Sequence, residues 1–286
     1  MSGKQITPVI EFTRKNLRAP GADGYHRGMN PISRRTLAQA GTVLLTTNAF
    51  AETAPSPIPE QWPVQPSALA IEMVGVSHLN FKRTKELVEA WPTLVNAAID
   101  WGFGDWESAL GAASHVGSQD IAEYLIANGA RPTLFSAAML GQLEVVKAML
   151  EAQPGVQKIR GPHSISLLAH ARAGGPQAER VLKYLESLGD AGSPPQPPLT
   201  AEEKAALEGT WIFGKGAKDR LEVKTNRNGV LTMTHPGNEA RNLLHLGSLD
   251  FHPAGAPTVR VRFAGQGRDM VLTVHDKDIL VTAKRD

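Results

Sequence analysis

The chain has 286 residues, of which 42% are hydrophobic and none is cysteine. This length supports one or two domains with buried cores, and the lack of cysteine excludes disulfides, zinc–thiolate sites and a cysteine nucleophile. Residues 1–51 hold 7 of the 30 Lys/Arg and 2 of the 28 Asp/Glu, which leaves 23 basic and 26 acidic residues elsewhere. The basic balance therefore belongs to the leader, and the remaining chain lacks the charge pattern of a nucleic-acid-binding protein.

The leader has the organisation of an export signal. Residues 1–28 carry no periodic pattern and are predicted to be unstructured, so translation from either Met1 or Met29 stays open. Within 29–51, Arg34-Arg35 precedes an apolar run, and Ala49-Phe50-Ala51 forms a small-x-small cleavage site. This arrangement resembles a twin-arginine signal peptide, although Leu37 replaces the usual Phe and leaves general export open. The resemblance implies a periplasmic or secreted protein, cleaved near Ala51.

The next segments are a linker and a helical region. Residues 52–66 contain five prolines and are predicted to be extended, whereas apolar residues recur at helical spacing within 67–191. The clearest unit is Ser108–Thr133. Gly117 ends a short helix of small residues, Ile121 and Leu125 begin the apolar stripe of a second helix, and Gly129 ends it because glycine readily adopts positive φ.

This unit resembles an ankyrin repeat, with Gly117, Ile121, Leu125 and Gly129-Ala130 at matching positions, although Ser108–Gly111 replaces the usual Thr-Pro-Leu-His. Related patterns at 85–92, 141–150 and 167–185 bring the number of degenerate repeats to about four. One repeat cannot bury its own apolar face, so neighbours must stack on it. The resemblance implies an α-solenoid that binds another protein through its β-fingers and its concave face.

An enlarged finger is predicted between the first two repeats, where aromatic residues crowd together. Aromatic side chains are favoured interface anchors, but they also serve to cover the exposed end of a repeat stack. We expect another exported or periplasmic protein as the partner. The predicted partner-binding residues are Trp101, Phe103, Asp105 and Trp106 on the finger, and His115, Met139 and Arg172 near the edge of the first helices.

A second linker, at 192–200, precedes a β domain at 201–286. Thr200 and Glu203 predict a capping box on a helix over 201–207, and beyond Trp211 the apolar period changes from about 3.6 to 2. Asn228-Gly229 predicts a hairpin. Seven or eight antiparallel strands are expected, in a small open barrel or a sandwich. The spacing of these predicted strands resembles that of lipocalin-like β domains. The predicted fold class is therefore α+β, with an α-solenoid followed by this β domain.

The ionisable residues give little sign of a catalytic or metal site. His163 and His170 are seven apart, but no acidic residue stands at ligand spacing from either, and His-x-x-x-His is absent. Asp105 and Glu107 are two apart, so a strand would place both on one side. A metal site, a cofactor and catalytic residues are not expected. Four histidines of the β domain fall at strand ends or turns, where convergence at one mouth stays open: His235, His245, His252 and His275.

The sequence thus predicts an exported, non-enzymatic protein that binds another protein through ankyrin-type repeats, with no membrane span. The main alternative is a carrier of a small apolar, lipid-like ligand that encloses the ligand in its β domain. A weaker alternative is a hydrolase that uses Asp105, Glu107 or His163 as acid or base. An apolar cavity with an open mouth in the β domain would favour the carrier.

Overall fold

The computed structural model describes residues 63–286. The unstructured segment predicted at 1–28, the signal peptide at 29–51 and most of the linker at 52–66 lie outside these described residues. Within 63–286, no helix combines the length and the hydropathy that crossing a membrane would require.

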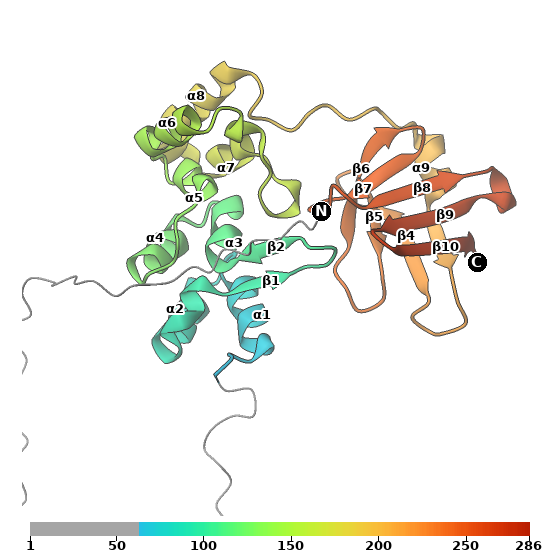
Figure 1. The fold of residues 1–286 in the computed structure, drawn as a ribbon, viewed down its shortest axis with the longest axis horizontal. Helices are drawn as coiled ribbons and strands as arrows, with labels where there is room; N and C mark the ends of the chain where they lie inside the picture. The colour runs from blue at the N-terminus through green and yellow to red at the C-terminus, as the bar shows by residue number, and fades with distance from the viewer. Residues whose placement is uncertain (1–62) are drawn as a thin grey trace, which may run out of the picture. The chain divides into compact units, whose positions relative to one another are not determined.

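The first part of the described chain is a stack of helices arranged in consecutive pairs (Figure 1). The first helices of successive pairs pack on one another, in the order α1, α3, α5 and α7, while second helices pack in the contacts α2 with α4 and α6 with α8. Several of them are connected by short 3-10 turns: η1 (Pro92–Asn96), η2 (Val156–Lys158), η3 (Pro162–Ser164) and η4 (Gly175–Ala178). The helices are α1 (Ser67–Val76), α2 (Phe81–Ala90), α3 (Ala109–Val116), α4 (Gln119–Ala127), α5 (Leu134–Met139), α6 (Leu143–Ala152), α7 (Leu167–Ala173) and α8 (Glu179–Leu188).

Local sequence explains where these helices begin and end. The Ser108 side chain caps α3 by accepting from the backbone N–H of Gly111, and Thr133 forms a capping box with Ser136 at the start of α5. Gly117 ends α3 with φ 80°, and Gly129 follows α4 with φ 96°, so the predicted helix–glycine–helix pattern is confirmed.

Two apolar clusters hold the stack together. One joins α1 to α4 and includes Met73, Leu87, Leu110 and Leu125, all buried. The other, which joins α5 to α8, includes Leu185. Because each cluster draws on neighbouring helix pairs, the pairs stabilise one another, as the apolar stripes predicted.

The second part is a closed antiparallel barrel of eight strands, preceded by helix α9 (Ala201–Leu207) (Figure 1). Each strand pairs with the next along the chain, and β10 pairs with β3 through Ile212 and Lys284. The barrel is thus closed, whereas the spacing of the predicted strands had suggested an open barrel or a sandwich. The α+β class is confirmed. The strands are β3 (Gly209–Ile212), β4 (Arg220–Thr225), β5 (Leu231–Thr234), β6 (Arg241–Gly247), β7 (Asp250–Pro253), β8 (Arg260–Ala264), β9 (Val271–Asp276) and β10 (Ile279–Arg285).

Side chains that alternate along the strands fill the barrel. Trp211, Phe251 and Leu272 are fully buried inside it. The capping box of Thr200 with Glu203 at the start of α9 is confirmed, as is the β4–β5 hairpin at Asn228-Gly229.

Candidate functional site

A β-hairpin between η1 (Pro92–Asn96) and α3 occupies the position of the predicted enlarged finger. Its strands are β1 (Ala98–Asp100) and β2 (Trp106–Ser108), paired antiparallel. At the tip, the side chain of Asp100 accepts from the backbone N–H of Gly102 at 2.7 Å and of Gly104 at 3.1 Å. Phe103, between them, has φ 60°, a region that non-glycine residues rarely enter. The tip is therefore held in one particular shape by its own hydrogen bonds.

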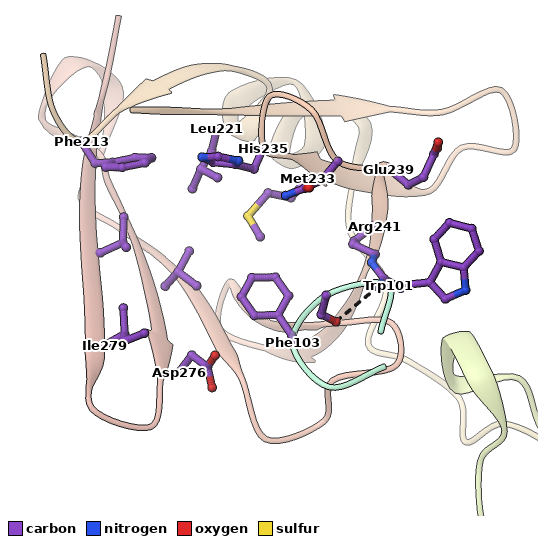
Figure 2. A pocket seen from close by; sticks show the side chains of 14 residues that line it. Trp101, Phe103, Phe213, Leu221, Met233, His235, Glu239, Arg241, Asp276 and Ile279 are labelled. Carbon is purple, nitrogen blue, oxygen red and sulfur yellow. Dashed lines mark hydrogen bonds between the residues drawn. The ribbon is translucent and has the colours of Figure 1, made fainter. Parts of the chain in front are cut away.

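The tip of this hairpin meets the mouth of the barrel. A cavity of about 270 Å³ lies there, and the ring of Phe103 projects into it (Figure 2). Arg241, at the start of β6, donates a hydrogen bond of 3.4 Å to the backbone carbonyl of Gly102. The barrel side of the cavity is mainly apolar, and its apolar side chains include Phe213, Leu221, Met233, Val274 and Val281.

The base of the hairpin carries two buried carboxylates. Asp105, beside β2, accepts from the backbone N–H of His163 at 2.9 Å and lies 2.7 Å from its ring Nδ1. The guanidinium of Arg241 contacts the same carboxylate. His163 stands in η3 (Pro162–Ser164) with φ 58°, so the loop is turned to place both its N–H and its ring on Asp105.

Glu107, in the centre of β2, has a fully buried side chain that is surrounded by three imidazoles. The Nε2 atom of His78 lies 3.6 Å from Oε2, that of His115 lies 2.9 Å from Oε1, and that of His163 lies 3.5 Å from Oε2. Trp101 donates its indole N–H to Oε2 at 2.7 Å. Three chain segments beyond the hairpin therefore converge on one carboxylate: the α1–α2 turn, the last turn of α3, and η3.

These contacts shift the ionisation of the cluster. Burial raises the pKa of Asp105, but hydrogen bonds from His163 and Arg241 outweigh burial and hold it below its usual value. Burial likewise raises the pKa of Glu107, and the imidazoles of His115 and His163 more than offset this and hold it well below its usual range. Burial lowers the pKa of His163, yet its bonds to Asp105 and Glu107 raise it to about 9. Both carboxylates are thus ionised at neutral pH.

The other histidines considered from sequence lie apart from this cluster. His170 is fully buried, packs 4.7 Å from the ring of Phe135 and holds its Nδ1 2.9 Å from the carbonyl of Ser166. Burial lowers the pKa of His170 to about 4. In the barrel, His235 lines the cavity at the hairpin tip, whereas His245 and His252 line a different one.

The predicted partner-binding residues take different positions. Trp106 is 64% exposed, and Phe103, 41% exposed, faces the barrel cavity. Asp105 and His115 belong to the buried cluster, Arg172 is exposed beside Glu186, and Met139 is fully buried. A buried Met139 has no surface to offer a partner, because it ends α5 inside the apolar cluster that also joins α1 to α4.

The sequence paired Asp105 with Glu107, but it gave no link from this pair to His115 or His163 and did not single out His78. The alternation Asp105-x-Glu107 was the usable signal, since both carboxylates are buried and both contact His163. No protein-family model matches this chain, and no curated protein matches it significantly.

Proposed function

We propose that the barrel binds a small apolar molecule in the cavity that the hairpin tip covers. The main observation that supports this proposal is the apolar cavity at the barrel mouth, with the Phe103 ring inside it (Figure 2). Ligand pockets are typically concave, apolar and supplied with a few oriented polar groups. Here the polar groups include Arg241, His235 and Asp276, which line the cavity among apolar neighbours.

The size of the cavity limits the ligand. At about 270 Å³ it lies just below the range of roughly 300–1,000 Å³ that is usual for pockets of drug-sized ligands. A compact apolar molecule with one or two rings or a short chain fits this space, and withdrawal of the Phe103 ring would enlarge it. The hairpin tip then acts as a cover that competes with the ligand for the barrel mouth.

Binding of another protein is a second candidate, which the exposure of Trp106 favours. In this proposal the helix pairs are ankyrin-type repeats, and the β1–β2 hairpin is the enlarged finger. Packing of the first helices on one another supports the repeat assignment. We further propose that the leader directs export of the protein. The protein would then meet its ligand or partner in the periplasm or outside the cell. The two candidates use different faces of one hairpin.

Titration with the fluorescent probe 1-anilinonaphthalene-8-sulfonate tests the barrel cavity. The wild-type chain should enhance probe fluorescence with a saturable curve. The variant Val274→Phe should weaken binding by about tenfold, because its ring would occupy the cavity and remove the space of roughly two buried methylene groups. Val274 faces the barrel interior on β9 and lines the cavity.

Val271→Phe is the matched control, because Val271 is on the same strand with its side chain on the opposite face. It should leave probe affinity within about twofold of wild type. The absence of saturable enhancement in the wild type, or an equal loss in both variants, would overturn the carrier proposal. The second candidate would then be favoured if the wild-type chain captures a periplasmic protein and Trp106→Ala does not.

A further inference from the structure

We propose that His78, Glu107 and His115 form a binding site for a divalent transition-metal ion, with Zn²⁺ as the expected ion. The three side chains come from the α1–α2 turn, from β2 and from the last turn of α3. One donor atom from each lies within 4.8 Å of the others. This site is separate from the barrel cavity and does not depend on the proposed ligand binding.

The distances suit a small cation. Two ligand atoms bound tetrahedrally, each about 2.0–2.1 Å from Zn²⁺, are about 3.3 Å apart. The two Nε2 atoms of His78 and His115 are 3.2 Å apart. His115 Nε2 lies 2.9 Å from Glu107 Oε1 and His78 Nε2 lies 3.6 Å from Oε2, so each imidazole has one carboxylate oxygen near this spacing. An ion therefore fits with only small side-chain adjustments.

The orientation of the His78 ring also suits a ligand. Its Nδ1 lies 3.1 Å from the carbonyl oxygens of Val74 and Gly75, which only accept hydrogen bonds, so Nδ1 carries the proton. The lone pair is then on Nε2, which faces Glu107. Metal-binding histidines are commonly held in this way, with the second ring nitrogen donating to a carbonyl or a carboxylate.

Ion pairing without a metal explains part of this arrangement. Asp105 and Glu107 are balanced in charge by Arg241 and by His163. That account leaves Glu107 Oε1 unexplained. Among the described residues it has no hydrogen-bond partner, although its side chain is fully buried. His115 Nε2 lies 2.9 Å from Oε1 and helps to hold the pKa of Glu107 low, but it is poorly aligned for a hydrogen bond with Oε1 and better aligned with His78 Nε2, 3.2 Å away. A buried, unpartnered carboxylate oxygen is costly, and a cation among the three donors would satisfy it.

The donor set points to the class of metal. Two imidazoles and one carboxylate are the ligands of many open zinc sites, in which three protein groups leave a further coordination position. On the His78 side of the site, a second cavity of about 300 Å³ is lined by His78, His163, Trp101 and Arg241. His163, held by Asp105, stands beside the site and faces Glu107 with its Nε2.

Calorimetric titration of the chelator-treated full chain with Zn²⁺ tests the proposal. We expect one ion per chain with micromolar or tighter affinity. His78→Ala and Glu107→Gln should each weaken binding at least about 100-fold, since loss of the hydrogen-bond partner of a ligand already costs about 10–100-fold. His275→Ala, in the exposed end of β9, should leave affinity unchanged. Circular dichroism should show that the variants are folded.

Co²⁺ provides a readout on the wild type alone. Bound Co²⁺ should give the visible absorption of a four-coordinate ion and should broaden the ring-proton NMR signals of His78 and His115 but not those of His275. This measurement decides the question even if a variant fails to fold. The proposal is overturned if the wild type binds neither ion, if His78→Ala binds as the wild type does, or if the broadened signals belong to histidines other than His78, His115 and the adjacent His163.

Discussion

His170 is the residue whose burial should make stability depend on pH. The pKa of about 4 in the fold lies below the ordinary value of 6.5, so the unfolded chain takes up a proton first as pH falls. The stabilisation is fully present above pH 6.5 and is lost as pH falls toward 4. Between pH 7.5 and 5, the loss should be about 2 kcal/mol.

Urea unfolding of wild type and His170→Gln at these two pH values measures the effect. The decrease in the free energy of unfolding between pH 7.5 and 5 should be about 2 kcal/mol smaller in the variant, because groups common to both proteins cancel. His275→Gln serves as the control. A decrease of the same size in His170→Gln and wild type would show that His170 accepts its proton inside the fold.

Single residues also show why the site was hard to predict from sequence. The alternation Asp105-x-Glu107 indicated one shared face, and it was right. Two partners of these carboxylates are far along the chain: His163 is 58 residues from Asp105, and His78 is 29 residues from Glu107 (107 − 78). Ligand spacing within one helix or one loop is visible in a sequence, whereas convergence of a turn, a helix end and a 3-10 turn is set by packing.

At the scale of helices, Gly117 and Gly129 allow the energetic cost of a left-handed backbone to be measured separately from the cost of disturbing close packing. Both have positive φ, 80° and 96°. A Cβ at Gly117 would overlap the backbone carbonyl of Ala173 at the end of α7, whereas a Cβ at Gly129 would meet nothing within 4 Å. The close approach of α3 to α7 therefore requires glycine at position 117. No neighbouring atom of the described residues imposes such a requirement at position 129.

We expect Gly129→Ala to lower the free energy of unfolding by about 1–2 kcal/mol, the cost of a left-handed conformation for a residue with a Cβ. Gly117→Ala should lose about 3 kcal/mol or more, because overpacking adds about 1–3 kcal/mol. Urea unfolding at one pH measures both. Equal losses would show that α7 moves away from α3 at no cost.

The strands illustrate a different limit of prediction. The sequence predicted seven or eight strands, of which the barrel has eight, and Asn228-Gly229 located one hairpin. Closure was not predictable, because it depends on pairing between Ile212 and Lys284, 72 residues apart, and on strand tilt that no local pattern records. The β1–β2 hairpin was expected only as an enlarged finger, since three-residue strands are too short to show a period.

At the scale of the whole described chain, the pair Asp105–Arg241 links the helical stack with the barrel. Asp105 stands beside β2 and Arg241 begins β6, and both side chains are buried. The same guanidinium donates to the Gly102 carbonyl in the hairpin tip. Removal of one partner from a buried pair typically costs about 3–5 kcal/mol, because the other charge is left without compensation.

A double-mutant cycle with Asp105→Asn and Arg241→Gln measures this link in urea unfolding. Arg241→Gln should lower the free energy of unfolding by about 3 kcal/mol. The double variant should lose about 1–3 kcal/mol less than the sum of the single variants, the coupling expected for residues in direct contact. Asp105→Asn also weakens the contact with His163, which Arg241→Gln leaves in place, so the two single variants need not be equal. Additivity within about 0.5 kcal/mol would mean that the pair does not hold the hairpin on the barrel. Phe103 would then cover the cavity through its own packing alone.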